Sequence, residues 1–178
     1  MPYARRAVSK GTLYHVVCAA PATASAHEFV SLAQGSGWDV RVIATPLGAR
    51  FADIDRLSEL TGDQVRSEFR LPGDEPGLPS ADAVVVAPAT FNTINKWAAG
   101  IADTFAVSLL CELTGFGVPI LAVPMLKDAL ARHVAFARSI EVLKSMGIRV
   151  QFDPLAPPGA RMPPWPQVLD EVHTVTRA

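Results

Sequence analysis

The stretch ADAVVVAPATFNTINKWAAGIADTFA, residues 81–106, decides the fold class. It begins with an apolar run, Val84–Ala87, that has the character of a strand covered on both faces. We expect Pro88 to end this strand, because proline has no N–H to donate to a ladder. Small and polar residues follow, and residues 92–99 then have helical spacing. Such a strand end keeps side chains small and lets a flat ligand approach the backbone.

Strand and helix patterns alternate along the rest of the chain. Short apolar runs predict the strands, and apolar residues three and four apart predict the helices. The predicted strands are 12–18, 39–44, 83–87, 118–123 and 148–152, and the predicted helices are 22–34, 47–60, 92–99, 102–113, 127–146 and 167–176. Short strands that are nearly all apolar indicate a parallel sheet with helices on both faces. We therefore expect a doubly wound α/β fold of the Rossmann or flavodoxin-like type, built as a single domain over residues 1–178.

Bulk composition excludes several classes of protein. Hydrophobic residues make up 49% of the 178 and charged residues 19%, so the chain is globular and not disordered. The net charge of -1 gives no reason to expect nucleic acid as a partner. No apolar run reaches the length of a membrane span, and the run at 12–18 fits a strand better than a signal peptide. We expect a cytoplasmic protein with free, buried Cys18 and Cys111 and, from its scattered histidines, no metal site.

The carboxyl ends of the predicted strands locate the candidate site, because ligands of doubly wound sheets bind there. Four segments follow the first four strands: AAPATAS, TPLGARF, PATFNT and PMLKDAL. In the third, Asn92 and Thr93 can cap the next helix or bond a polar ring edge, and an ordinary turn with an asparagine cap is the alternative. The proline-rich residues 71–80 predict a loop. A second such segment, 153–166, predicts a substrate flap or a subunit-interface arm.

The segment APATFNTINKWAAGIADT resembles the PASANT motif region of the flavin-containing cysteine decarboxylases. In that family the motif reads Pro-Ala-Ser-Ala-Asn-Thr and is followed by a helix and a Gly-Ile-x-Asp element. Thr90 replaces the serine and Phe91 the second alanine. The matching residues are Pro88, Ala89, Asn92 and Thr93 in the motif, and Gly100, Ile101 and Asp103 in the element after it. The resemblance covers roughly residues 12–152, and flavin prenyltransferases are more distant relatives.

The resemblance implies a flavin mononucleotide (FMN) cofactor held between subunits of a trimer, and such trimers often assemble into dodecamers. Pro88–Thr93 would line the flavin ring, and Thr45 would contact the phosphate at a helix N-terminus. For Thr45 a simple turn hydroxyl is the alternative. The cofactor-binding residues expected in this way are Ala20, Pro21, Thr45, Phe51, Pro88, Ala89, Thr90, Asn92 and Thr93, and the expected catalytic residues are Asn92 and Lys127.

Two family features are missing at the amino-terminal side of the site. The loop after the first strand usually reads Gly-Ser-Ile-Ala, whereas residues 19–22 read Ala-Ala-Pro-Ala, so the serine contact to phosphate is lost. Thr23 or Ser25 could compensate. The decarboxylases also have a histidine about seven residues before the Ala-Asp that opens the third strand, and that count arrives at Asp74. The position is empty, or a segment of another subunit supplies the group.

Two further features differ toward the carboxyl terminus. After the fourth strand the decarboxylases read Pro-x-Met-Asn, and here Lys127 takes the place of the asparagine. A lysine could bind a substrate carboxylate as a point charge, with Arg50 as the second choice. The alternative is a helix-start residue paired with Asp128 or solvent. Residues 151–178 contain no cysteine, although phosphopantothenoylcysteine decarboxylases have a catalytic cysteine in that region.

The hypothesis favoured by the resemblance is a lyase that oxidatively decarboxylates a cysteine-containing substrate on FMN. The chain has no second, ligase-like domain, which favours a peptide with a C-terminal cysteine over phosphopantothenoylcysteine. The alternatives are a flavin-binding protein of the same fold without decarboxylase activity and a flavin prenyltransferase-like enzyme. The expected partners are a peptide or small-molecule substrate and further copies of the chain, with no nucleic acid and no membrane.

Overall fold

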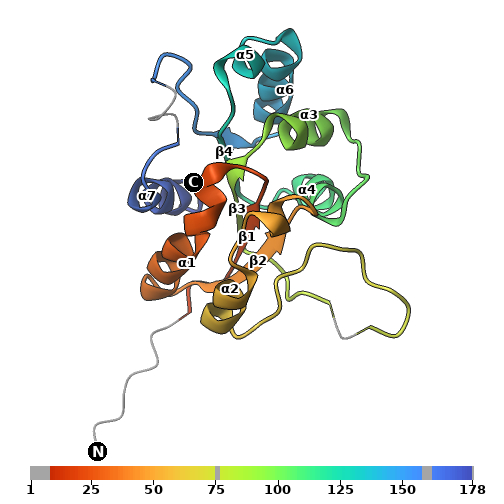
Figure 1. Ribbon diagram of the computed structural model, residues 1–178, viewed down its shortest axis with the longest axis vertical. Helices are drawn as coiled ribbons and strands as arrows, with labels where there is room; N and C mark the ends of the chain where they lie inside the picture. Colours follow the sequence, from red (N-terminus) through yellow and green to blue (C-terminus); the bar gives the residue numbers. More distant parts are fainter. Residues whose placement is uncertain (1–8, 75–76, 158–161, 178) are drawn as a thin grey trace, which may run out of the picture.

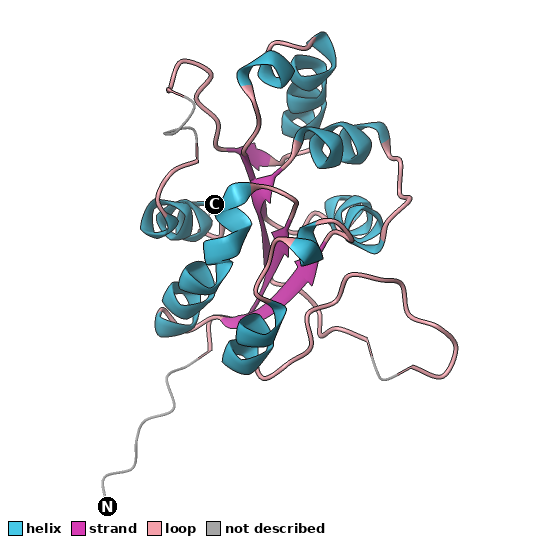
Figure 2. Cartoon of the chain, in the orientation of Figure 1, coloured by secondary structure: helices cyan, strands magenta, loops and turns pink. Residues whose placement is uncertain are grey.

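The computed structural model describes residues 9–74, 77–157 and 162–177 (Figures 1 and 2). Within these residues the chain forms a five-stranded parallel sheet in the order β2-β1-β3-β4-β5. The strands are β1 (Thr12–Val17), β2 (Asp39–Ala44), β3 (Ala83–Ala89), β4 (Ile120–Pro124) and β5 (Arg149–Val150). The predicted doubly wound, flavodoxin-like class is thus confirmed.

Helices cover both faces of this sheet (Figure 2). They are α1 (Ala26–Gly35), α2 (Ile54–Thr61), α3 (Phe91–Ala99), α4 (Phe105–Gly115), α5 (Asp128–Ala131), α6 (Val134–Ser145) and α7 (Trp165–Val175), with short 3-10 helices η1 (Pro21–Ser25) and η2 (Gly48–Arg50). None of the helices in the described ranges is long and apolar enough to cross a membrane. The predicted flap at 153–166 includes 158–161, which lie outside the described residues.

The core consists of two apolar layers, one on each face of the sheet. Because successive side chains of a strand point to opposite faces, Leu13 and Val17 pack with α1, α2 and α7, whereas Tyr14 and Val16 pack with α3, α4 and α6. This two-sided burial explains why most strand residues are apolar; the charged residues Asp39 and Arg41 lie on β2, at the edge of the sheet. Cys18 is buried and free as predicted, and Cys111 is free and half-buried.

The prediction that Pro88 ends the third strand is wrong. β3 continues through Pro88 to Ala89, and its pairing with β4 shifts register between Val86 and Ala89. A proline is tolerated there because the ladder is already interrupted, so no regular N–H contact is lost. The peptide bond between Ala87 and Pro88 is cis. The strand therefore carries the motif's first two residues into the sheet itself.

Two predicted helices are each divided in the structure. The helix expected at 127–146 becomes α5 and α6, because Nδ1 of His133 accepts a hydrogen bond from the Ala135 N–H at 3.1 Å and starts a new helix. The helix expected at 47–60 becomes η2 and α2, and the Asp53 carboxylate caps the second by accepting from the Arg56 N–H at 3.1 Å. Periodicity predicted both regions but not these local caps.

The order of the strands fixes the place where a ligand can bind. β1 lies between β2 and β3, so the chain leaves β1 toward one edge of the sheet and continues from β3 toward the other. The loops after β1 and β3 therefore diverge at the carboxyl edge. This divergence opens a crevice at the switch in strand order.

Candidate functional site

A cavity of about 760 Å³ opens at this carboxyl edge. Segments that are far apart in the sequence line it, and most of their side chains are apolar. The lining residues are Ala19, Ala20 and Pro21 after β1; Thr45, Pro46 and Leu47 after β2; Thr90, Phe91, Asn92, Thr93 and Lys96 from α3 and its cap; Thr104 and Val107 of α4; and Met125, Leu126, Lys127 and Leu130 after β4. All four segments predicted from the sequence therefore contribute to one cavity.

The segment after β3 forms the floor of the cavity. Thr90 caps α3, since its hydroxyl accepts from the Thr93 N–H at 3.4 Å and donates to the Thr93 hydroxyl at 3.1 Å. Asn92 is therefore not the cap, and its side chain makes no hydrogen bond to the described residues while it lines the cavity. An amide that the fold does not use remains available to a ligand.

Phe91 stands where the family motif has a small alanine, and it also lines the cavity. Its ring stacks on Phe136 with a centroid separation of 6.4 Å and lies edge-on to His133 at 5.7 Å. The start of α3 is thus packed against α6. Phe91 occupies space in the cavity that an alanine would leave open.

The turn after β2 forms one wall. The Thr45 hydroxyl accepts from the Gly48 N–H at 3.0 Å, and the Thr45 N–H donates to the Val17 carbonyl at 3.0 Å. A Cβ on Gly48 would lie 2.6 Å from the Val17 carbonyl oxygen, so only glycine allows this close approach. Since the Thr45 hydroxyl is an acceptor for Gly48, its own O–H remains free to donate into the cavity.

The loop after β1 contributes backbone and small side chains. Thr23 is fully buried and donates its hydroxyl to the Cys18 carbonyl at 2.5 Å. The Ser25 hydroxyl donates to the Ala22 carbonyl at 3.1 Å and accepts from the Trp165 indole N–H at 3.0 Å. Neither hydroxyl lines the cavity, so neither replaces the family's missing serine.

Two lysines line the cavity, and they differ in their partners. Lys96 forms an ion pair with Asp103, which neutralises it. Lys127 stands at the cap of α5, is exposed, and forms no ion pair with the described residues, so the alternative of a helix-start residue that faces solvent stays open. The α3 and α4 helices also begin here, with Thr90 and Thr104 as their caps. An unpaired cation and two helix N-termini favour an anionic ligand.

Cys18 lies beneath the floor, beside the cap of α3. Burial raises the pKa of its thiol, and contacts with Thr93 and Thr90 oppose this shift only in part. The thiol is therefore protonated at neutral pH and is not an activated nucleophile. Within the described residues no cluster of three or more metal-ligating side chains occurs.

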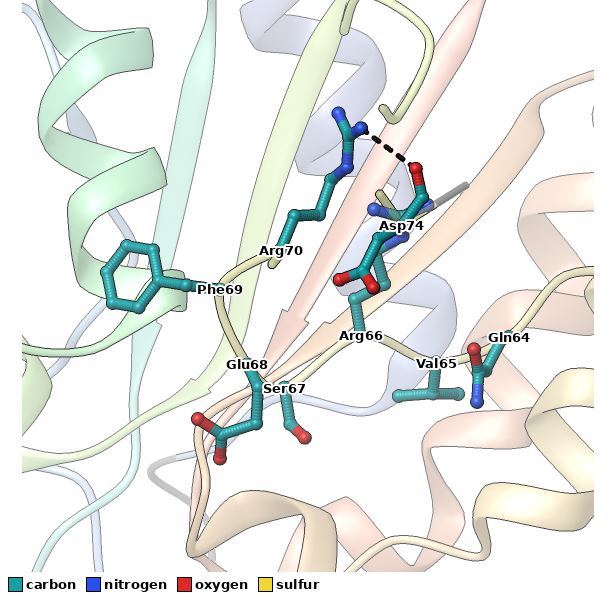
Figure 3. A pocket seen from close by; sticks show the side chains of 8 residues that line it. All are labelled: Gln64, Val65, Arg66, Ser67, Glu68, Phe69, Arg70 and Asp74. Carbon is teal, nitrogen blue, oxygen red and sulfur yellow. Dashed lines mark hydrogen bonds between the residues drawn. The ribbon is translucent and has the colours of Figure 1, made fainter. Parts of the chain in front are cut away.

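Asp74, at the counted position of the family histidine, lies in a different place. Its carboxylate accepts from the Leu71 N–H at 2.5 Å, and the residue borders a separate hollow of about 420 Å³ (Figure 3). We call this the loop hollow; it is lined by residues 64–70 and Asp74. No histidine is among the described residues that line the cavity.

The predicted site residues fall into two groups. Ala20, Pro21, Thr45, Thr90, Asn92, Thr93 and Lys127 line the cavity, whereas Phe51, Arg50, Pro88 and Ala89 do not. Pro88 and Ala89 are buried in β3, whereas Arg50 at the end of η2 and Phe51 directly after it are exposed. Sequence reasoning missed Lys96, Thr104 and Val107. Lys96 follows Asn92 by four residues, and this spacing on one helical face could have identified it.

Comparisons with known proteins agree with this geometry. The model of the Flavoprotein family matches residues 5–177. The chain is 30% identical over 144 residues to the coenzyme A biosynthesis bifunctional protein CoaBC of Thermococcus kodakarensis, covering 75% of this chain and 35% of that protein. It is 39% identical over 67 residues to a cysteine/cysteine sulfinic acid decarboxylase from an unknown prokaryotic organism, covering 38% of this chain and 18% of that protein. The chain thus spans about a third or less of the length of these curated relatives.

Solved structures share the fold at low sequence identity. The FMN-dependent cysteine decarboxylase TvaF from thioviridamide biosynthesis superposes with a TM-score of 0.78 at 20% identity, covering 96% of this chain and 100% of that one. A PPC decarboxylase complexed with pantothenoylaminoethenethiol gives 0.75 at 17% identity, with 96% and 100% covered. The peptidyl-cysteine decarboxylase EpiD gives 0.71 at 23% identity, with 92% and 98% covered.

Proposed function

The chain belongs to the Flavoprotein family, and we propose that it binds FMN in the cavity and oxidatively decarboxylates a cysteine-containing substrate. The observation that carries this proposal is the convergence of four separate strand-end segments on one cavity whose floor is the PASANT-like segment. A cavity of this size, mostly apolar with a few polar groups, suits a flat ring system with a charged tail.

The polar groups of the cavity fit the parts of FMN. The free O–H of Thr45 is available to a phosphate oxygen, and the small loop at Ala20 and Pro21 lets that phosphate approach. Thr90, Asn92 and Thr93 would lie along the ring, with the Asn92 amide at its polar edge or at the substrate carboxylate. Pro88 and Ala89 would support this floor from below, within β3. Phe51, the residue after η2, does not line the cavity, and we assign it no contact with FMN.

The bound flavin would supply a two-electron oxidation of the carbon that carries the substrate thiol. The resulting thioaldehyde is a β-thioxo carboxylate, which loses carbon dioxide and leaves an enethiol. Lys127 would hold the substrate carboxylate until it departs, because it is a cavity cation that forms no ion pair with any residue that the structure describes. The apolar side chains of Met125, Leu126 and Leu130 would exclude water around it.

Among substrates, we favour a peptide with a C-terminal cysteine over phosphopantothenoylcysteine. Residues 151–178 have no cysteine to serve the latter chemistry, and the cavity opens beside exposed apolar residues such as Leu47 and Leu130. We also propose that the protein forms a homotrimer or a dodecamer. Exposed Phe69 and Phe116 support an interface, since they leave large apolar side chains in water.

One observation favours a second function, flavin binding without decarboxylation. No histidine is among the described cavity residues, and lysine replaces the family's asparagine after β4. A protein of this kind would hold FMN on the same floor and release no carbon dioxide. The two functions share every step up to flavin binding.

The test begins with the purified protein. We expect a yellow protein whose acid extract contains FMN by mass spectrometry, and absence of flavin together with no binding of added FMN would end the proposal. With a peptide that ends in cysteine, we expect a product lighter by about 46 Da, which is the loss of carbon dioxide and two hydrogens. Full FMN occupancy without such a product would leave the flavin-binding function.

Two variants divide the roles within the site. Lys127→Ala should lower turnover about tenfold to a hundredfold and leave FMN bound, because a charge-assisted contact contributes about 1.5–3 kcal/mol. Lys144→Ala, an exposed lysine of α6 paired with Glu141, is the matched control and should not alter turnover. Asn92→Asp should weaken FMN binding by placing a negative charge at the floor, and unchanged affinity would remove Asn92 from the site.

A further inference from the structure

His15 is a buried histidine that the proposed chemistry does not use. It lies on β1 with no solvent exposure. Its ring packs against Phe29 of α1, with centroids 4.6 Å apart, and against Trp165 of α7 at 5.8 Å. Burial lowers the pKa of the imidazole from 6.5 to about 4, and a hydrogen bond to the backbone of Ala87 opposes this only in part. The ring is therefore neutral at physiological pH.

One nitrogen of this ring holds a specific carbonyl. Nε2 lies 2.7 Å from the carbonyl oxygen of Ala87. Because a carbonyl can only accept, Nε2 carries the hydrogen, and Nδ1 is the unprotonated nitrogen. Nδ1 is buried and has no hydrogen-bond partner among the described residues. A buried polar atom without a partner is costly, so an apolar residue would satisfy packing better than this histidine does.

The carbonyl that His15 holds belongs to an irregular part of β3. The ladder to β4 is interrupted between Val86 and Ala89. Three successive carbonyls of this stretch are each held by a separate donor, two of them from β1 or its end and one from the end of β4. The Pro88 carbonyl accepts from the Cys18 N–H of the β1 end at 3.3 Å, the Ala89 carbonyl from the Met125 N–H of the β4 end at 2.9 Å, and the Ala87 carbonyl from His15.

The residue after these three carbonyls is Thr90, the first residue of the cavity floor. Any rotation of the Ala87 or Pro88 peptide planes therefore moves Thr90, Asn92 and Thr93 relative to the cavity. The Pro88 and Ala89 carbonyls are fixed by backbone N–H groups, which every residue except proline supplies. The Ala87 carbonyl is fixed by the side chain of His15, so among the three contacts this one depends on which side chain stands at position 15.

We propose that His15 is a positioning residue: its Nε2–H holds the Ala87 carbonyl and so sets the cavity floor against the cofactor. The inference rests on the proposed function, because it requires that FMN lies on Thr90–Thr93. It assigns to His15 no proton transfer and no contact with FMN. It explains why a histidine with one unsatisfied nitrogen stands in an otherwise apolar strand.

Three variants test this role. His15→Phe keeps an aromatic ring but removes the donor, whereas His15→Gln keeps a side-chain N–H that can reach the same carbonyl. Phe29→Leu disturbs the same aromatic cluster without touching Ala87 and is the packing control. The measurements are the FMN dissociation constant, the visible absorption spectrum of the bound flavin and the thermal midpoint of the apoprotein.

We expect His15→Phe to raise the FMN dissociation constant about threefold to tenfold, the loss associated with one hydrogen bond, and to shift the spectrum of bound flavin. His15→Gln should restore the wild-type constant to within about twofold. Phe29→Leu should lower the thermal midpoint and leave both flavin readouts unchanged. Wild-type FMN binding and spectrum in His15→Phe would overturn the inference while the proposed function stands.

A measurement on the wild-type protein keeps the inference testable if His15→Phe does not fold. Nitrogen-15 NMR of the imidazole in the apoprotein should show a neutral ring protonated at Nε2 from pH 7 to pH 5. A ring protonated at Nδ1, or one that titrates near its ordinary pKa, would overturn the inference. Failure of the wild-type protein to bind FMN would instead refute the proposed function, and the positioning role with it.

Discussion

The cavity at the carboxyl edge and the loop hollow are built in opposite ways. Four strand-end segments spread over more than half of the chain converge on the cavity, whereas the described residues that line the loop hollow are 64–70 and Asp74 (Figure 3). Their volumes are about 760 Å³ and about 420 Å³. In the loop hollow Arg70 donates to the Asp74 carbonyl at 3.3 Å, and Phe69 is half exposed.

The difference between the two hollows is how firmly the folded core holds the residues that line them. The walls of the cavity are anchored in the core: Thr93 is buried, and buried Gly48 lies against the end of β1. Folding of the sheet has already ordered these groups, so a ligand finds them in place. The loop hollow is lined by a segment that is tied to the sheet at Arg66, which exchanges backbone hydrogen bonds with Val42 and Ala44 of β2. Residues 68–70 and Asp74 are exposed, so the core supports their ordering less. We expect substitutions in the two hollows to have very different effects.

The largest expected difference is between alanine substitutions at two glycines, Gly48 and Gly77. Gly48→Ala puts a Cβ 2.6 Å from the Val17 carbonyl oxygen, so the backbone must move. We expect the free energy of unfolding to fall by about 3 kcal/mol, and we expect FMN binding to be lost. Gly77→Ala brings a Cβ 3.3 Å from the movable end of Arg70 and should alter neither. Urea unfolding and FMN titration measure both. Equal effects in the two variants would break the comparison.

The pH dependence of the free energy of unfolding tests the role of His15 beneath the cavity floor. His15 has a pKa of about 4 in the folded protein and 6.5 as an ordinary histidine, so the unfolded chain takes up the proton first on acidification. The contribution of His15 to the free energy of unfolding is fully present above pH 6.5. It is lost as the pH falls from 6.5 to 4, and below pH 4 no further loss occurs. Between pH 7 and pH 5 we expect a loss of about 2 kcal/mol relative to His15→Gln. Urea unfolding at both pH values measures it, and equal losses in the two proteins would contradict the assignment.

Two phenylalanines give a smaller contrast. Phe91→Ala removes a ring that packs on Phe136 and His133 and should cost about 1–2 kcal/mol of unfolding free energy, because the site is only partly buried. It should also admit bulkier peptides at the cavity. Phe69→Ala removes a half-exposed ring with one ring contact, to Phe105, and should cost less than about 1 kcal/mol. Thermal unfolding would show whether Phe91→Ala loses more stability than Phe69→Ala, and a series of peptides of increasing size would show whether the cavity admits bulkier substrates. A larger loss in Phe69→Ala would contradict the prediction.

The smallest effect is expected within the loop hollow itself. Arg70→Ala removes an exposed hydrogen bond to Asp74 and should change the free energy of unfolding by less than about 0.5 kcal/mol. FMN affinity and turnover should stay at wild-type values. A tenfold loss of either would show that the loop hollow takes part in function, and it would remove the distinction between the two hollows.

The sequence predicted the parts of the cavity better than its details. Apolar runs predicted the four strands and their carboxyl ends, and the rule for ligands in doubly wound sheets then selected the segments that line the cavity. The sequence wrongly predicted that Pro88 ends the third strand, because strand propensity does not reveal an irregularity in the pairing. It did not identify Lys96 or Thr104 as cavity residues, since these come from helices whose facing depends on packing.

The sequence by itself determined the fold class, because burial on both faces requires apolar strands and this pattern is local. It also determined which segments carry small and polar residues. Only the tertiary structure decided that Thr90 and not Asn92 caps α3, that Lys96 is neutralised by Asp103 while Lys127 is not, and that His15 reaches Ala87. These are contacts between groups up to 72 residues apart in the chain. The pairing of β1 with β3 brings His15 to Ala87, which spacing along the chain cannot specify. The cap of α3 and the Lys96–Asp103 pair are local, but several polar side chains near each of them could have made the contact, and only the folded geometry selects one.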